Sequence, residues 1–299
     1  MQPGLGFGVF HEPVLLREVL RFLSPKEGKV IVDATVGTGG HAEALLAHGA
    51  RVIGIDQDPQ SLEVAKARLR PFGERFFPLR GNFRRLRELL AALGITQVDG
   101  VLFDLGLSSL HLSQAERGFS FQHDGPLDMR MDPDNPVTAG DLVNGLPERE
   151  LVRILREYGE ERYAERIARE IVKNRPLRTT GELARLVARC YPPGSYRIHP
   201  ATRTFQALRI AVNDELSALR EALPQAVELL RPGGVLCVIS FHSLEDRIVK
   251  RFLREAARTG KVKLLTKKPV RPSPEEVARN PRARSARLRA AQVPEVPSP

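Results

Sequence analysis

A glycine-rich turn between two apolar runs is the feature that most limits how this chain can fold. The run that begins at Val30 reaches Asp33 and breaks into Gly-Thr-Gly-Gly-His at 37–41, and a second apolar run then ends at Asp56. Strand, turn, helix and strand in this order form the unit with which α/β sheets bind nucleosides. Glycines let the backbone approach a ligand closely. We therefore expect a nucleoside site in which Asp56 faces the two hydroxyls of a ribose.

Short apolar runs alternate with segments of helical period on both sides of this turn, which predicts a parallel sheet with helical crossovers. The expected strands are 30–34, 51–55, 75–80, 98–105, 235–240 and 262–265. The expected helices are 13–23, 41–48, 59–70, 83–93, a long helix 202–230 that would break near Pro224, and 244–258. The last thirty residues contain six prolines and are expected to be mainly extended and in part mobile.

The strand–helix alternation stops after Asp104. Residues 106–136 are rich in Gly, Ser, Asp and Pro and predict an ordered loop, whereas 138–190 predict helices. The simplest architecture is an α/β domain formed by 1–107 and 214–299, split by a mainly helical insertion at 108–213 that would recognise the substrate.

Positive charge is unevenly distributed along the 299 residues, whose formal net charge is +10. Residues 1–147 carry 15 basic and 18 acidic side chains, 148–213 carry 14 and 8, and 261–299 carry 10 and 3. Segregated positive charge favours a polyanionic partner, most simply nucleic acid. The alternative is a solvated surface in a chain that prefers arginine, since there are 37 Arg and 9 Lys.

Several classes of protein are not expected. No apolar run approaches the roughly 20 residues of a membrane helix, and no secretory signal is visible, so we expect a cytoplasmic protein without a membrane partner. Cys190 and Cys237 are far apart, which is typical of buried thiols in a reducing compartment. The seven histidines have no ligand spacing with Cys or acidic residues, so we expect no catalytic metal.

The glycine turn by itself fits two cofactors. Gly37-x-Gly39-x-x-Ala42, with Asp56 further on, matches the dinucleotide fingerprint, so a dehydrogenase that uses NAD is one alternative. Against it, Asp33 ends the first strand and Asp104 ends the fourth. Carboxylates there can face an ammonium group or fix the turn. The Leu-Arg-Pro-Gly-Gly turn at 230–234 is familiar from S-adenosylmethionine enzymes, whose cofactor has no pyrophosphate.

Six further blocks resemble the RsmH (MraW) family of bacterial 16S ribosomal RNA cytosine-N4 methyltransferases. They are HEPVLL at 11–16, GFSF at 118–121, GPLDMRM at 125–131, HPATRTFQ at 199–206, SFHSLEDR at 240–247 and NPRAR at 280–284. The resemblance spans about 11–289. It implies a class I, Rossmann-like methyltransferase domain with an inserted helical domain, S-adenosyl-L-methionine as the methyl donor, and one decoding-region cytidine as the acceptor. The implied partner is 16S rRNA within the small ribosomal subunit, and the protein would be a monomer or a homodimer.

The resemblance also implies the cofactor contacts. Asp56 would bind the ribose hydroxyls, Phe83 would lie against the adenine, and Asp104 would approach the methionine end of the cofactor. His111 stands where the family commonly has Gln. The full set is Gly39, Gly40, His41, Asp56, Phe83, Asp104 and His111. From the residues alone, His41 is equally well interpreted as a helix cap and Phe83 as a core residue.

The candidate RNA contacts are basic, imidazole and aromatic residues of the matched blocks: Arg203, Phe205, Arg209, His242, Arg247, Arg282 and Arg284, with Asp128 and Arg130 as further candidates. Each has a structural alternative. Arg203 and Arg209 also fit the polar face of a helix, and the segment from His242 to Arg247 also fits a capped first helical turn.

Asp104 is the candidate catalytic residue. The exocyclic amine of cytosine is a poor nucleophile because its lone pair is delocalised into the ring. A carboxylate or a backbone carbonyl that accepts the amine hydrogens would localise that lone pair. We expect Asp104 or a neighbouring carbonyl to do this. A non-enzymatic alternative is a ribosome-assembly factor that binds RNA without transferring a methyl group, and free RNA and the assembled subunit both remain open as the acceptor.

Overall fold

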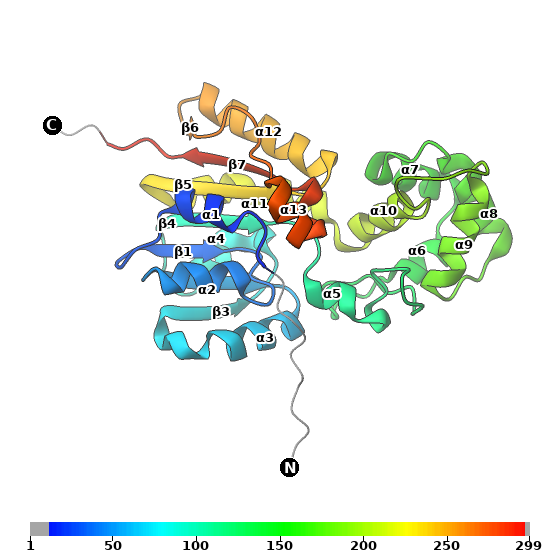
Figure 1. Cartoon of the computed structure of the whole chain (residues 1–299), viewed down its shortest axis with the longest axis horizontal. Helices are drawn as coiled ribbons and strands as arrows, with labels where there is room; N and C mark the ends of the chain where they lie inside the picture. The colour runs from blue at the N-terminus through cyan, green and yellow to red at the C-terminus, as the bar shows by residue number, and fades with distance from the viewer. Residues whose placement is uncertain (1–11, 297–299) are drawn as a thin grey trace, which may run out of the picture. The chain divides into compact units, whose positions relative to one another are not determined.

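The computed structural model describes residues 12–296, which divide into two compact units (Figure 1). Unit 1 contains the described residues up to Gly106 and those from Ala218 onward, and unit 2 is Leu107–Ser217. His11 of the HEPVLL block lies outside the described residues. No described helix is long and apolar enough to cross a membrane.

Unit 1 is built on a seven-stranded sheet with the order β3-β2-β1-β4-β5-β7-β6. The first five strands are parallel, and β7 runs antiparallel to both of its neighbours. Their bounds are β1 Val30–Asp33, β2 Arg51–Asp56, β3 Phe76–Arg80, β4 Val98–Asp104, β5 Leu230–Ser240, β6 Lys263–Leu264 and β7 Arg287–Gln292. Because β1 lies between β2 and β4, the turn after β1 is at the carboxyl edge of the parallel strands, where α/β proteins bind ligands.

Two apolar cores cover the two faces of this sheet. One contains buried residues of α1 Leu16–Leu23, α2 Gly40–Ala47 and α3 Pro59–Leu69. The other contains buried residues of α4 Leu86–Ala91, α11 Glu215–Leu229 and α12 Ser243–Arg258. Short 3₁₀ segments complete the unit: η1 Arg70–Arg75, η2 Phe83–Arg85 and η4 Pro281–Ser285. With both faces covered, the strands are almost continuously apolar, as expected for a buried parallel sheet.

The C-terminal segment differs from the expectation of a mainly extended, partly mobile tail. It forms α13 Pro274–Arg279, η4 and β7, and β7 fits between β5 and β6 with Cys237 opposite Ala290. Ser273 caps α13 by accepting the backbone N–H of Glu276 at 3.1 Å, and Pro274 occupies the first turn. Glu276 in turn accepts the backbone N–H of Leu15 at 2.7 Å. Glu276 of α13 therefore anchors the backbone at Leu15, directly before α1.

Unit 2 is helical and has its own core, whose members all lie between Leu107 and Val212. Its elements are α5 Ser109–Ser113, η3 Ala115–Arg117, α6 Ala139–Gly145, α7 Glu148–Gly159, α8 Ala164–Asn174, α9 Thr180–Cys190 and α10 Thr202–Asn213. Thr138 and Thr179 begin α6 and α9 with capping boxes.

The long helix expected over 202–230 is two helices, and the expected break near Pro224 is wrong. The chain breaks at Asp214, which has φ 48° and ψ 43°, and Pro224 lies inside α11. Asp tolerates this left-handed conformation better than most residues, which explains why the break falls there.

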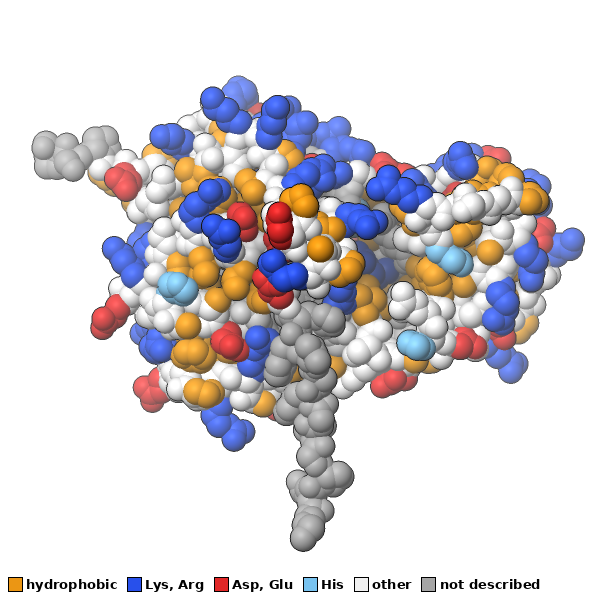
Figure 2. Space-filling model, in the orientation of Figure 1, with side chains coloured by type: hydrophobic (Ala, Val, Ile, Leu, Met, Phe, Trp, Pro, Cys, Tyr) orange, Lys and Arg blue, Asp and Glu red, His pale blue; other side chains and the backbone are white. Residues whose placement is uncertain are grey.

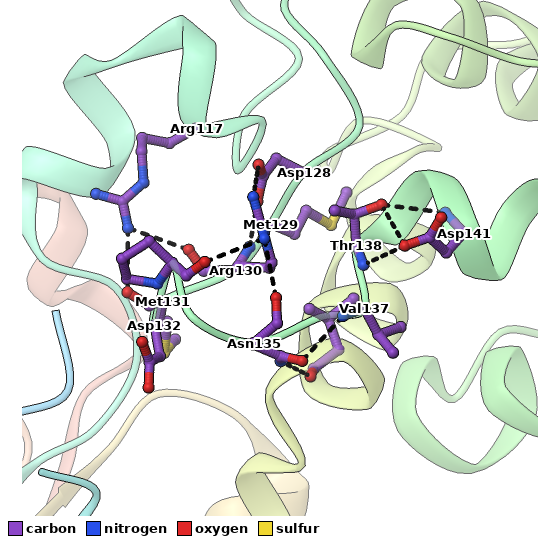
Figure 3. Close-up of polar contacts among 12 residues, drawn as sticks. Arg117, Asp128, Met129, Arg130, Met131, Asp132, Asn135, Val137, Thr138 and Asp141 are labelled. Atoms are coloured by element: carbon purple, nitrogen blue, oxygen red, sulfur yellow. Dashed lines mark hydrogen bonds and ion pairs between the residues drawn. The ribbon is translucent and has the colours of Figure 1, made fainter.

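Hydrogen bonds from side chains, rather than a ladder of paired strands, hold the irregular backbone at 117–138 (Figure 3). Arg130 binds both carboxylate oxygens of Asp128 and donates to the carbonyls of Pro133 and Asn135. Asn213 accepts the backbone N–H of Met131 and donates to the carbonyl of Met129, each at 2.8 Å. The side chains of Asp128 and Arg130 thus act within the loop, as the structural alternative to RNA contact requires.

Candidate functional site

The carboxylate of Asp56 orders the turn between β1 and α2. One of its oxygens accepts the backbone N–H of Gly37 at 2.9 Å, and the other accepts the N–H of Asp58 at 2.9 Å. Gly37 and Gly39 have φ of 53° and 91°, a region that favours glycine. Asp56 therefore orders the turn through both of its carboxylate oxygens.

Close packing behind the turn explains the adjacent glycine. A Cβ at Gly40 would lie 2.8 Å from Cγ of Pro13, and one at Gly39 would lie 3.1 Å from a methyl group of Leu69. Pro13 and Leu69 of α3 thus pack closely against the turn and restrict the conformations of its backbone.

Three polar residues connect the ends of β1 and β4. Asp33 is 1% exposed and accepts the backbone N–H of Thr35 at 3.2 Å. Thr35 accepts the backbone N–H of Asp104 through its hydroxyl at 2.6 Å. The sequence analysis did not identify Thr35; its position directly after a strand that ends in Asp33 was the available signal.

His41 lies between the carboxylates of Asp33 and Asp104, in the first turn of α2. Its Nε2 is 2.8 Å from the carbonyl of Val14, and its Nδ1 is 3.4 Å from a carboxylate oxygen of Asp104. A carbonyl only accepts, so Nε2 carries a proton and donates it to Val14. In the neutral ring Nδ1 then has a lone pair, and a hydrogen bond to Asp104 requires a proton on that carboxyl group.

Burial shifts the pKa values of all three groups in the direction that favours their neutral forms. Burial raises the pKa of Asp104 to about 7, with a further increase from Glu245 and an opposing effect of Arg282. Burial likewise raises the pKa of Asp33 to about 7, and it lowers the pKa of His41. The other carboxylate oxygen of Asp104 is buried and has no hydrogen-bond partner in the described part of the chain. Strongly shifted acids at a sheet edge are typical of functional sites.

Two further charges reach Asp104 from distant parts of the sequence. Glu245 is buried at the start of α12 and accepts the backbone N–H of Phe241 at 2.8 Å. Arg282, in η4, is half-buried, and the charge of Asp104 partly offsets the desolvation that lowers the Arg282 pKa. The sequence analysis assigned Arg282 to RNA and did not assign Glu245 at all, because no local pattern connects either residue with Asp104.

Phe83 lies on η2, beside the ends of β2 and β3. Its ring packs edge-on against Phe103 with centroids 5.3 Å apart, and it remains half-exposed. Asn82 caps η2 and donates to the side chain of Gln57 at 3.2 Å. The sequence analysis missed Asn82 and Gln57, whose amides can recognise the edge of a base.

These residues fit S-adenosylmethionine. The carboxylates of Asp33, Asp56 and Asp104 form an acceptor-rich edge suited to hydroxyl and ammonium groups. The buried, unpartnered oxygen of Asp104 supplies an acceptor without a donor. Leaving such an oxygen dry is unfavourable unless a ligand or water pairs with it. At Gly39 and Gly40 the turn has no side chain beyond the backbone, so its peptide groups can approach a nucleoside closely.

The remaining predicted cofactor residue, His111, belongs to unit 2. It is 4% exposed, and its Nδ1 accepts the backbone N–H of Ser108 in the capping box of α5. Its ring packs on Phe119 with centroids 4.8 Å apart. The structure therefore shows a local role for His111, and contact with the cofactor stays a prediction.

The predicted RNA residues of unit 2 have different environments. Arg203 is exposed and donates to the carbonyl of Glu160. Arg209 binds Glu215 through two hydrogen bonds of 2.8 and 3.0 Å. Phe205 is 5% exposed and packs against Phe121 in the core. Of the three, only Arg203 presents its side chain at the surface of the unit.

The predicted RNA residues of unit 1 also differ in their environments. His242 caps α12: its Nδ1 accepts the N–H of Glu245, and its Nε2 lies 3.1 Å from the Glu245 carboxylate. The cap is therefore His242, whereas the sequence suggested a cap formed with Ser243. Arg247 and Arg284 are exposed.

Comparison with known proteins bears on the family to which this chain belongs. The sequence profile of the MraW methylase family matches residues 8–293. The ribosomal RNA small subunit methyltransferase H of Carboxydothermus hydrogenoformans is 53% identical over 302 residues, covering 94% of this chain and 97% of that protein. The protein of the same name from Thermotoga neapolitana is 52% identical over 293 residues, covering 96% and 97%.

A solved structure of an rRNA methylase from Streptococcus thermophilus aligns over 96% of this chain and 100% of its own, with 11% identity and a TM-score of 0.47. The assignment depends instead on the profile, which spans nearly the whole chain, and on the two relatives above 50% identity. The glycine turn and the three strand-end carboxylates fall inside the matched region. The chain belongs to the MraW methylase family and is a methyltransferase that uses S-adenosylmethionine.

Proposed function

We propose that this enzyme methylates the N4 amine of one cytidine in the decoding region of 16S ribosomal RNA. The observation that carries the proposal is the match over 94–96% of the chain to relatives named ribosomal RNA small subunit methyltransferase H. The choice of N4 and of the decoding region depends on the sequence blocks that resemble the RsmH family. The basic balance of 148–213 supports a polyanionic substrate.

The cofactor, when bound, supplies an electrophilic methyl group on a sulfonium. The chain must position an amine in line with it, and alignment of this kind accounts for much of the rate enhancement. Asp104 has an unpartnered carboxylate oxygen at the sheet edge that can accept an amine hydrogen. In its ionised form Asp104 localises the amine lone pair and takes the proton that the amine loses. The hydroxyl of Thr35 accepts the backbone N–H of Asp104 and so holds the end of β4 in place.

The proposal is tested by mass-spectrometric mapping of small-subunit rRNA from cells with and without this protein. We expect one cytidine to lose a methyl group in the deletion strain and to regain it when the wild-type gene is returned. Complementation with Asp104→Asn is expected to leave that cytidine unmethylated at N4. An unchanged methylation map in the deletion strain would exclude the proposal.

We also propose that the acceptor is RNA within the small subunit and that the enzyme works in the cytoplasm, as a monomer or homodimer. A basic segment suits a large RNA surface. In vitro methylation of naked 16S rRNA and of isolated subunits from the deletion strain distinguishes the two substrates. Faster transfer to naked rRNA would contradict this part of the proposal.

A further inference from the structure

The exposed face of α8 carries a row of cations. Arg166, Arg169 and Lys173 follow one another at intervals of three and four residues, so they share one face of the helix, and Arg162 precedes them on the same line. All four are exposed. Successive members are about 5 Å apart along the helix axis. Figure 2 shows Lys and Arg side chains gathered over the part of unit 2 where Figure 1 draws α8 and α9.

These cations form no ion pair with an acidic side chain in the described part of the chain. By contrast, two exposed arginines of the neighbouring helix α7 are paired: Arg153 with Glu150 and Glu157, and Arg156 with Glu165 of α8. A row of unpaired like charges on one helix face is unfavourable for the isolated unit. An anionic partner would relieve that repulsion.

Arg189 and Arg203 extend this row onto α9 and α10. Burial raises the pKa of the Cys190 thiol, and the charges of Arg166 and Arg189 both oppose that rise. Arg162 and Arg203 both act on the hydroxyl of Tyr191 in the same way. Arg189 in α9 and Arg203 in α10 therefore act on the same side chains as Arg166 and Arg162.

Half-exposed aromatic rings lie among these cations. The centroids of Tyr163 and Tyr191 are 4.7 Å apart, and those of Tyr191 and Tyr196 are 5.4 Å apart. Tyr191 donates its hydroxyl to the buried Glu161 at 2.5 Å, which fixes the cluster. Arg162 lies over the ring of Tyr163, 4.8 Å from its centroid. Tyrosine rings that are partly exposed can stack on unpaired bases.

We propose that this face of unit 2 is a docking surface for single-stranded ribosomal RNA, an inference that rests on the proposed function. We name it the α8 surface and define it by Arg162, Arg166, Arg169, Lys173, Arg189 and Arg203 with Tyr163 and Tyr196. The cations bind phosphates, and the tyrosines stack on unpaired bases. This surface positions the substrate and takes no part in the chemistry.

RNA fits this surface better than an acidic protein does. An acidic peptide would use the cations but would leave the tyrosine cluster without a planar partner. Unpaired nucleotides offer a phosphate and a flat base in every unit, so they match alternating charge and ring. The surface lies wholly within unit 2, and each contact used here joins residues of that unit.

The test is a triple variant, Arg166→Ala with Arg169→Ala and Lys173→Ala, measured for binding to 16S rRNA over a range of salt concentrations. Three lost phosphate contacts are expected to weaken binding about 10- to 100-fold and to reduce the salt slope by about 2. The KM for RNA should rise with little change in kcat. Tyr163→Leu should weaken binding about 10-fold with the salt slope unchanged.

The matched control is Arg149→Ala with Arg153→Ala and Arg156→Ala on α7, which removes the same charge from exposed positions of the same unit. It should change RNA affinity less than about 3-fold, because Arg153 and Arg156 are already paired with acidic side chains and all three residues lie outside the α8 surface. Circular dichroism and cofactor titration should match wild type for both triples.

Equal RNA binding by the two triples would overturn the α8 surface even if the wild-type enzyme methylates rRNA. A loss confined to whole subunits, with naked rRNA bound normally, would assign the surface to a protein and would also overturn it. If the wild-type protein binds rRNA through this surface but transfers no methyl group, the proposed function fails and the surface stands.

Discussion

At the residue scale, Asp104 connects stability with function. Its pKa of about 7 in the folded chain lies well above the ordinary value near 4, because the folded protein favours the protonated form. Between these two values the folded state binds more protons than the unfolded state, so its stability falls as the pH rises. Above about pH 7 this loss is complete. The ionised carboxylate is thus maintained at a cost to the fold.

Asp104→Asn removes this titration. Relative to wild type without cofactor, we expect the variant to gain about 2 kcal/mol in free energy of unfolding between pH 5 and pH 8. The same variant should bind S-adenosylhomocysteine more weakly at pH 8. Urea unfolding at both pH values, together with calorimetric titration, measures the two effects. A pH-independent difference between variant and wild type would show that Asp104 titrates normally.

The glycine turn gives a second residue-scale prediction. Gly39→Ala is expected to cost about 2–3 kcal/mol, since it combines left-handed strain with a Cβ placed 3.1 Å from Leu69. Gly28 has a similar φ of 85° but no heavy atom within 4 Å of its added Cβ. Gly28→Ala should therefore cost only about 1 kcal/mol by chemical denaturation. Equal losses would mean that packing behind the turn is loose.

At the element scale, β7 completes the sheet although it looks unlike a strand. Leu288 is fully buried in the core shared with α1, α2 and α3. Leu288→Ala should reduce the free energy of unfolding by about 3 kcal/mol, as for other buried leucines. Val296 is 72% exposed, and Val296→Ala should change it by less than about 0.5 kcal/mol. A mild effect at Leu288 would indicate that β7 is dispensable.

The parallel core was predictable because strands that are buried on both faces, such as β4 over 98–104, consist mainly of apolar residues. β7 has the sequence Arg-Leu-Arg-Ala-Ala-Gln, with no β-branched residue, so nothing local marks it as a strand. The Ser273-Pro274 pair is typical of a helix start, but the prolines around it favour an extended segment. Local propensity cannot show which strands a late segment joins.

The candidate site was likewise predictable from the sequence only in part. Asp33, Asp56 and Asp104 end strands, and that position was enough to predict a ligand edge. The approach of Arg282 and Glu245 to Asp104 depends on where the last part of the chain returns to the sheet, and no spacing records it. Arg209 looked like an RNA contact because its partner Glu215 lies beyond the helix break.

At the scale of the whole molecule, each unit has a core of its own. Every member of the helical core lies within 107–217, a continuous segment. We therefore expect the fragment 107–217 to fold alone, with a helical circular dichroism spectrum and a cooperative thermal transition. The matched control is the same fragment with Leu155→Asp, which places a charge at a fully buried position and should abolish the transition. A non-cooperative wild-type fragment would contradict the prediction.

The antiparallel strand inserted between β5 and β6 also constrains synthesis. A ribosome that is making this chain releases β5 and β6 before β7, so the edge of β5 stays unpaired until β7 has emerged. Glu276 and Arg282, which reach the N-terminal segment and Asp104, emerge equally late. A chain that stops before β7 would therefore lack the strand that joins β6 to the rest of the sheet.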